Sequence, residues 1–452
     1  MNGFCRKFCI VGFLIFIMLI SGISGMANNE IKSPEEANIN WRQFEGSAIR
    51  IFMAKHYLQE YVQKFTPEFE ELTGIKVEFD VLSEVEYFAK LVSGFESKTL
   101  SHEVYMANMG FVAREYANNW IAPLEQYINN PNLTDKEWFD YEDFWNAGRM
   151  SGTINGTVVA FPFHGDASGF IYRKDIFDEL GISPPKTFED VINASKIIKE
   201  KTSHYGFVTR GGQFLWVTLQ AWVRSYGGSY VDENWDANLT DPNTIKGVQA
   251  FVDALKYGPP GITNYGWTEV GESMANGASS MFYDSIGIWS WLSDPDKVSI
   301  DPKNLVLGPP LAGPDGKTET LWGAWLIGLN NLSKNREAGW LFLQWASSKP
   351  TVLKMALEGG IFPSRESIAD NEQVIEKFGE EWLSNEKEAV KYARPMLITS
   401  QTSKILDEVD NAVQKALNNI MSVEEALQEG QKKMQAVIDE WKKSPESEFR
   451  SR

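Results

Sequence analysis

The sequence predicts an α/β fold, because segments patterned as strands and helices alternate along the chain. Residues 48–53 have the composition of a strand, and residues 75–81 alternate apolar and polar side chains as a strand does. Between them, apolar side chains recur at helical spacing over residues 61–72, and Gly74 stands where a helix-terminating glycine belongs. A strand, a helix and a second strand in succession form a βαβ unit, which predicts a parallel sheet.

Further helices are predicted downstream. Thr187 has the side chain of a helix N-cap, acids follow it in the first turn, and a helical apolar pattern runs over residues 191–198. Apolar side chains at helical spacing predict another helix over residues 405–416. Ser422 and Glu425 have the spacing of a capping box and predict the start of a last helix. No repeat, low-complexity tract or membrane span interrupts this α/β pattern.

Length and charge narrow the class of protein. The chain has 452 residues, which suggests more than one domain-sized unit, since a domain takes roughly 150 residues. Hydrophobic residues make up 43% and charged residues 23%, a mixture that indicates globular structure rather than disorder. The formal net charge of -18 repels phosphates and anionic lipids, so neither nucleic acid nor a membrane surface is an expected partner.

The N-terminus has the pattern of a secretory signal. Arg6 and Lys7 precede an uncharged apolar run over residues 8–20, and residues 25–27 fit a small-x-small cleavage site. The run is shorter than the roughly 20 residues of a membrane-spanning helix. We therefore predict a cleaved signal peptide over residues 1–27, followed by a polar linker over residues 28–45. An uncleaved anchor is the alternative.

The cysteines indicate an exported protein without a lipid anchor. Cys5 and Cys9 are the only cysteines, and both precede most of the apolar run, whereas a lipoprotein needs its cysteine after that run. The exported chain then has no disulfide, thiolate nucleophile or cysteine-ligated metal. A large exported protein of this kind suits the bacterial periplasm or cell surface.

The sequence lacks the local motifs by which common enzyme classes are recognised. The four histidines are scattered without metal-ligand spacing, and no nucleophile elbow, phosphate-binding loop or dinucleotide-binding glycine motif is present. No cofactor or metal is therefore expected. A secreted glycosidase needs only two carboxylates across a cleft, and a chain with 61 acids can supply them, so this remains the alternative function.

Several segments combine polar and aromatic side chains in a way that suits a ligand with hydroxyl groups. They contain His164 with Asp166, Asp284 with Trp289, Trp322 with Trp325, and Arg365. An acid or an imidazole can hydrogen-bond hydroxyls, a Trp ring can cover a sugar face, and an Arg can fork onto two hydroxyls. Each feature has a structural explanation too, since Asp and Arg also hold loops and Trp is more often core than platform.

The order of these segments resembles extracellular solute-binding proteins of the maltose-binding-protein-like class, the receptors of sugar ABC importers. The resemblance covers nearly the whole exported chain. It is carried by residues 69–77, 172–182, 184–190, 333–340 and 362–365. Residues 210–212, 225–229 and 256–261 look most like the members that take polyols or small sugars. Asp284-Ser285-Ile286 departs from that subgroup, in which Asp-Ala-Thr is more usual.

The resemblance implies a two-lobed periplasmic-binding-protein fold with three interlobe crossings and a ligand cleft between the lobes. The crossings are expected near residues 161–162, 322–328 and 361–365. Lobe 1 then comprises residues 46–161 and 322–361, and lobe 2 residues 162–321 and 362–445. The implied function is capture of a carbohydrate or polyol by a monomeric, non-enzymatic protein, which delivers it to the permease, the transmembrane subunits of an ABC importer.

The resemblance also implies a set of ligand-binding residues by matching position. Lys55 and His56 follow the first strand, and Asp166 stands where the family commonly has a ligand-binding acid. The expected set is Lys55, His56, His164, Asp166, Asp284, Trp289, Trp322, Trp325, Arg365 and Gln401; Gln401 is a weaker candidate, as is Ser400.

The export prediction can be checked on native material. The exported protein should begin near Asn28 and carry no lipid, because the cleavage pattern ends at Ala27 and no cysteine follows the apolar run. Intact-mass spectrometry of the native protein measures both. A mass that includes Met1, or an added diacylglyceryl group, would contradict the prediction.

Overall fold

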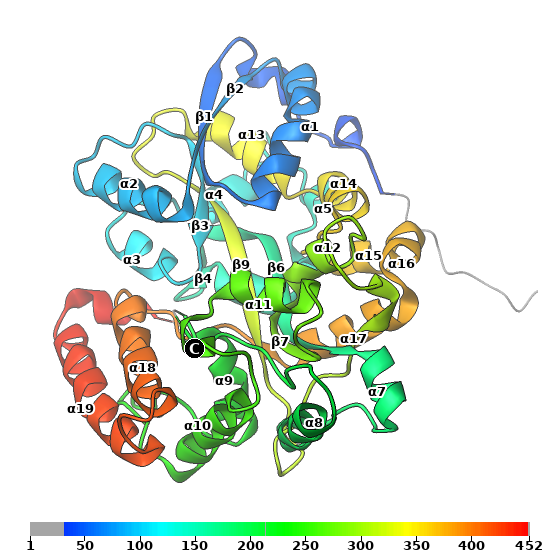
Figure 1. The fold of residues 1–452 in the computed structure, drawn as a ribbon. Helices are drawn as coiled ribbons and strands as arrows, with labels where there is room; N and C mark the ends of the chain where they lie inside the picture. Colours follow the sequence, from blue (N-terminus) through cyan, green and yellow to red (C-terminus); the bar gives the residue numbers. More distant parts are fainter. Residues whose placement is uncertain (1–30, 213, 451–452) are drawn as a thin grey trace, which may run out of the picture.

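The computed structural model describes residues 31–212 and 214–450, without the side chain of Val85. The predicted signal peptide, residues 1–27, lies outside the described residues. Two α/β lobes share one long mixed sheet, whose central strands run from one lobe into the other (Figure 1). Within the described residues this sheet has eight strands, in the order β2-β1-β3-β9-β6-β7, with β10 beside β9 and β8 beside β6. The described helices include none that is long and apolar enough to cross a membrane.

The predicted βαβ unit forms the sheet of lobe 1. Strand β1 (Ala48–Ala54) is parallel to β2 (Lys76–Leu82) and to β3 (Val104–Asn108). Helix α1 (Tyr57–Thr73) connects the first two strands and α2 (Glu84–Glu96) connects β2 to β3. Helix α1 ends at Gly74, which has the left-handed φ of 69° that glycine adopts without steric cost. The predicted α/β fold class and parallel pairing are confirmed.

Two long antiparallel strands connect the lobes. Strand β6 (Ala160–Arg173) pairs with β9 (Thr320–Leu329) from Ala160 opposite Gly328 to Ala167 opposite Trp322. The lobe 1 half of β9 also pairs with β3, and the lobe 2 half of β6 pairs with β7 (Met281–Ser285) and β8 (Leu305–Leu307). The ladder is irregular between Pro162 and His164, because proline has no N–H to donate.

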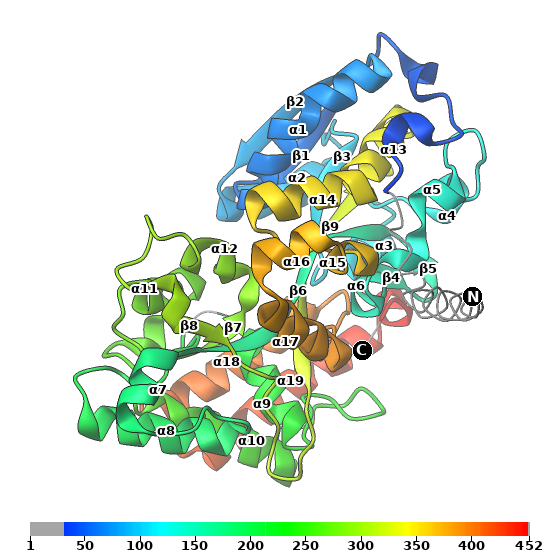
Figure 2. The ribbon, with the colours of Figure 1, turned by 90° about the vertical axis from the view of Figure 1, so that its right-hand side faces the viewer.

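A third connection leaves lobe 1 along a series of helices (Figure 2). Helix α14 (Lys349–Gly359) packs on α1, and α15 (Glu366–Ala369), α16 (Glu372–Phe378) and α17 (Glu380–Lys391) follow. Strand β10 (Ala393–Arg394) then pairs with the first residues of β9, Thr320 and Leu321. Phe362, within the segment expected to cross, stacks on Trp145 of lobe 1 at 6.0 Å and also contacts Trp382 of α17 at 6.2 Å.

Helices cover both faces of the sheet. Helix α8 (Phe188–Lys201) begins at Thr187 and α19 (Val423–Lys442) begins at Ser422, each with the capping box that its sequence pattern indicates. The remaining α-helices and strands are α3 (Val112–Ala117), α4 (Glu125–Ile128), α5 (Lys136–Phe139), α6 (Asn146–Ser151), α7 (Lys174–Leu180), α9 (Trp216–Ser225), α10 (Pro242–Leu255), α11 (Trp267–Ala275), α12 (Trp289–Leu292), α13 (Arg336–Ala346), α18 (Thr402–Leu417), β4 (Thr153–Ile154) and β5 (Thr157–Val158).

Both ends of the described chain contact lobe 1, and its last residue, Arg450, also lies over Trp235 of lobe 2. Residues 31–45, part of the expected linker, contain two short 3-10 helices, Pro34–Glu36 and Trp41–Phe44. Trp41 is buried and meets Trp138 edge to face at 5.6 Å, because a Trp ring buries a large apolar area. This segment is therefore part of lobe 1 rather than a free connection. At the other end, Phe449 follows the lobe 2 helix α19 and packs on Tyr116 of lobe 1 at 5.5 Å.

Candidate ligand-binding site between the lobes

A buried chain of polar contacts joins the two lobes where β6 passes between them. The Tyr57 hydroxyl, at the first residue of α1 in lobe 1, lies 2.9 Å from His164 Nε2. That nitrogen lies 3.2 Å from Asp166 Oδ2, and the Ser285 hydroxyl at the end of β7 donates to the same oxygen at 2.9 Å. His164 and Asp166 are two residues apart, so both side chains lie on one face of β6. We call these four residues the Asp166 cluster.

Two members of the cluster are almost completely buried, and Tyr57 and Ser285 are partly buried. His164 is 5% exposed and Asp166 2% exposed. Burial, followed by the charge of Asp166, raises the pKa of Tyr57 well above its usual value, so its hydroxyl keeps its proton and can donate. Burial, with a smaller effect of His164, lowers the pKa of the neighbouring His56 to about 3, so this imidazole is neutral near pH 7. The site therefore offers neutral hydrogen-bonding groups around one carboxyl group.

Gly287 lets the backbone of lobe 2 approach the cluster. It lies in a 3-10 helix, Ile286–Ile288, directly after β7. A Cβ atom at this position would lie 2.7 Å from Asp166 Oδ2 and 2.9 Å from the Tyr57 hydroxyl oxygen. Any side chain here would push the cluster apart, so the absence of one is required for lobe 2 to close on lobe 1.

A second charged pair lies on the lobe 2 side. Arg210 donates from Nε and Nη2 to the two carboxylate oxygens of Asp284, at 2.8 and 2.9 Å, and Asp284 is fully buried. Such two-point pairing fixes both side chains. Burial raises the pKa of Glu84, at the start of α2 in lobe 1, and the charge of Arg210 acts in the opposite direction. Arg210 thus acts electrostatically on the facing lobe.

A row of aromatic rings leads away from the cluster along lobe 1. His56 lies 5.7 Å from Trp325, and Trp325 is stacked on Phe88 at 5.9 Å with 13° between the rings. Phe88 in turn contacts Phe111 at 5.0 Å. Trp325 and Phe88 are partly exposed, so each keeps some ring surface available to a ligand.

The neighbouring Trp322 has a different role. It is fully buried, and Gly165 leaves the space that its ring fills. Trp322 and Trp325 are three residues apart on β9, so they lie on opposite faces of the strand. Trp322 is thus part of the core between the crossing strands. Trp289 stays partly exposed, two residues beyond Gly287, and packs on Trp382 at 5.7 Å.

Arg365 lies inside lobe 1, away from the Asp166 cluster. It is fully buried, and its Nε and Nη1 donate to the backbone oxygens of Ser347 and Asp140 at 2.7 and 2.8 Å. Its guanidinium lies 3.9 Å from the centre of the Phe144 ring and 3.5 Å from the Asp143 carboxylate. All these partners belong to lobe 1, so Arg365 holds that lobe together in this structure.

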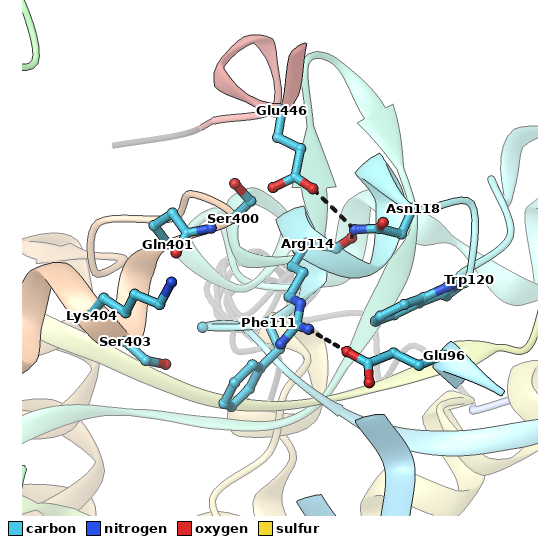
Figure 3. Close-up of a pocket in the computed structure, with 11 residues that line it drawn as sticks. Glu96, Phe111, Arg114, Asn118, Trp120, Ser400, Gln401, Ser403, Lys404 and Glu446 are labelled. Carbon is cyan, nitrogen blue, oxygen red and sulfur yellow. Dashed lines mark hydrogen bonds and ion pairs between the residues drawn. The ribbon is translucent and has the colours of Figure 1, made fainter. Parts of the chain in front are cut away.

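Gln401 lines a separate hollow between the lobes (Figure 3). This cavity has a volume of about 410 Å³. Its wall comes from α2 and α3 of lobe 1, from the start of α18 in lobe 2 and from the C-terminal segment, and consists of Glu96, Gly110, Phe111, Arg114, Asn118, Trp120, Ser400, Gln401, Ser403, Lys404 and Glu446. Phe111 belongs to both the aromatic row and this wall, so the cavity lies at the far end of the row from Asp166.

The structure therefore brings together part of the expected set. His164 and Asp166 share one cluster, His56 and Trp325 lie beside it, and Lys55 is exposed next to His56. The sequence analysis missed Tyr57 and Arg210. A signal for each exists in the sequence: Tyr57 follows the first strand directly after His56, and Arg210 stands before the Gly211-Gly212 loop. Among the described residues, no group of three or more His, Cys, Asp and Glu side chains is arranged to hold a metal ion.

Comparisons with known proteins agree with this architecture. The family described as bacterial extracellular solute-binding protein matches residues 55–352. The erythritol/L-threitol-binding protein of Mycolicibacterium smegmatis is 29% identical over 376 residues, which are 78% of each chain. The mannitol-binding protein of Pseudomonas aeruginosa is 22% identical over 318 residues, 68% of this chain and 69% of that protein.

Solved structures show the same two-lobed fold. A solute-binding protein from Agrobacterium radiobacter K84 in complex with ribitol superposes with a TM-score of 0.77 at 24% identity, over 87% of this chain and 99% of that chain. Maltose-bound T. maritima MalE3 superposes with a TM-score of 0.76 at 22% identity, over 86% of this chain and 100% of that chain.

The contacts of Arg365 predict a purely structural effect of its replacement. Arg365→Leu should lower the free energy of unfolding by about 3–5 kcal/mol, because Asp143 and two carbonyl oxygens lose a buried partner. Ligand affinity of the folded protein should not change. Denaturant unfolding and titration calorimetry measure the two effects. Lys334→Leu, at an exposed cation of the same lobe, is the control and should change stability by less than about 0.5 kcal/mol.

Proposed function

The chain belongs to the family of bacterial extracellular solute-binding proteins, and on that premise we propose that its solute is a polyol or small sugar bound at Asp166 between the lobes. Family membership confirms the prediction of a non-enzymatic solute-binding protein and decides against the glycosidase alternative. The solute itself is our proposal. The observation that carries it is the Asp166 cluster, whose members come from both lobes and from the strand between them.

The chemistry of the cluster suits a molecule with several hydroxyl groups. Each ligand hydroxyl can donate one hydrogen bond and accept others, so a polyol needs both kinds of partner. Among the described residues, the recorded hydrogen bonds to the Asp166 carboxyl group end on Oδ2, which leaves Oδ1 to accept from a ligand hydroxyl. The Tyr57 hydroxyl and the His164 ring supply further partners, and hydrogen bonds to a charged group are worth about 1.5–3 kcal/mol each.

The surroundings favour a small ligand with an apolar edge. The partly exposed rings of Trp289 and Trp325 can cover the C–H surface of a polyol or sugar. The Arg210–Asp284 pair can hydrogen-bond hydroxyls at the lobe 2 side. The names of the relatives support this class, because they include binding proteins for erythritol or L-threitol and for mannitol, and one structural neighbour holds ribitol.

Delivery to an ABC importer completes the proposal. We expect the protein to act as a monomer outside the cytoplasmic membrane and to lose residues 1–27 on export. Tyr57 of lobe 1 and Ser285 of lobe 2 are connected through His164 and Asp166, so a solute bound to the same groups would stabilise the closed form. The transmembrane subunits of the importer would then recognise that closed form.

A thermal-shift screen tests the solute class. Erythritol, L-threitol, ribitol, mannitol and maltose are compared with neutral and charged amino acids at equal concentration. We expect a polyol or sugar to stabilise the protein most, and a ligand present at 100 times its dissociation constant should add about 2.7 kcal/mol. Stabilisation by an amino acid alone would reject a carbohydrate or polyol as the solute.

The role of Asp166 makes a second prediction. Asp166→Asn keeps the shape of the side chain but removes its charge, and it should weaken binding roughly ten- to a hundred-fold, since every 1.4 kcal/mol is tenfold in affinity. Titration calorimetry measures the affinity, and ligand-free melting shows whether the variant is folded. Asp315→Asn, at an exposed acid in a turn, is the matched control. Native-like affinity in folded Asp166→Asn would place the ligand elsewhere.

A further inference from the structure

Glu386 is an acid in a row of apolar side chains. Helix α17 turns Trp382, Leu383, Ala389 and Val390 toward the interior, and Glu386 lies on the same face at helical spacing. Its side chain is completely buried. An acid at such a position costs stability compared with leucine unless it has a specific partner, so the residue requires an explanation beyond packing.

The partner of Glu386 is the backbone next to Asp166. Glu386 Oε1 accepts a hydrogen bond from the Ala167 N–H at 2.9 Å. The other oxygen, Oε2, has no hydrogen-bond partner among the described residues. Burial, followed by the charge of Asp166, raises the pKa of Glu386 well above its usual value, which favours the protonated, neutral form of this acid. A neutral acid can remain buried where a second carboxylate beside Asp166 could not.

Ala167 is the residue at which β6 changes partners. The ladder with β9 ends at Ala167 opposite Trp322, and the ladder with β7 begins at Ser168 opposite Ser285. The Ala167 N–H is therefore held by a side chain from α17, far away in the sequence, at the point where one ladder ends. This contact fixes the backbone that carries the Asp166 side chain.

All three connections between the lobes meet at this point. Ala167 belongs to β6, and its partner Trp322 belongs to β9. Helix α17 is the last helix of the third connection, and the Thr320 hydroxyl of β9 donates to its Ala389 carbonyl oxygen at 2.8 Å. Movement of α17 would therefore either pull the Ala167 N–H along with Glu386 or break this contact.

We propose that Glu386 is a positioning residue, which directs the Asp166 carboxylate toward the solute and couples solute binding to the placement of α17 between the lobes. The inference rests on the proposed function for the identity of the solute. Its geometric part, the Glu386–Ala167 contact, can be measured without any ligand. The carboxamide of glutamine has the same shape and the same acceptor oxygen, so it can replace a neutral acid here, whereas leucine cannot.

The experiment compares Glu386→Gln, Glu386→Asp and Glu386→Leu with Glu381→Gln and Glu381→Leu, which change an exposed acid of the same helix. Titration calorimetry uses the solute that gives the largest shift in the thermal screen. We expect Glu386→Leu to weaken binding about tenfold or more and Glu386→Gln to bind like the unchanged protein. Amide hydrogen exchange of ligand-free protein should show faster exchange at Ala167 in Glu386→Leu only.

Two results would overturn the proposal. Native affinity in folded Glu386→Leu would show that Glu386 only fills the core, and an equal loss in Glu386→Gln would show that its ionisation matters rather than its acceptor. If Glu386→Leu does not fold, Glu386→Asp decides, because its shorter side chain withdraws the acceptor and should also weaken binding. If the unchanged protein binds no polyol or sugar, the solute proposal fails. Amide hydrogen exchange at Ala167, measured without ligand, then still tests whether Glu386 holds the Ala167 backbone.

Discussion

The antiparallel pairing of β6 with β9 supports both lobes and the site between them. Each strand is long enough to reach into both lobes, so one ladder continues from one lobe into the other. The ladder is irregular at Pro162, where a donor is missing, and the residues that follow are His164 and Asp166. An irregularity of this kind next to a site redirects side chains without interrupting the strand. The polar groups therefore lie on a strand that is hydrogen-bonded to strands of both lobes.

Buried charges in this protein fall into two classes according to where their partners lie. Arg365 has all its described partners within lobe 1, so its contacts stabilise that lobe and are unaffected by movement between the lobes. Asp166 has partners from lobe 2 and, through His164, from lobe 1. Its contacts must change when the lobes separate. A buried charge with partners in two lobes costs stability when the lobes separate, which favours a role in binding over a purely structural one.

Glu386 belongs to neither class, because its hydrogen-bond partner among the described residues is a backbone group of a crossing strand. It connects the third crossing to the first through a single hydrogen bond to a backbone N–H. Burial and the neighbouring Asp166 raise the pKa of its carboxyl group and so favour the neutral form, which limits the cost of burying it. Tyr57 and His56 are also neutral in this site. The surroundings of Asp166 thus include neutral hydrogen-bonding groups, which a neutral polyol can use.

Local sequence patterns determined the secondary structure and the class of this protein. Alternation of apolar and polar residues, helical spacing and caps such as Thr187 and Ser422 depend on neighbouring residues. They can therefore be recognised along the chain, and they predicted the correct α/β fold. The segment around Asp166 was legible too, because it lies within one strand. The roles of Tyr57, Arg210 and Glu386 could not be predicted in this way, because they depend on partners far away in the sequence. Arg210 and Asp284 are 74 residues apart, and Glu386 and Ala167 are 219 residues apart. Only the tertiary structure decided these pairings. It also showed that Trp322 and Arg365 are buried in the core whereas Trp325 stays partly exposed, because burial depends on what packs against each side chain.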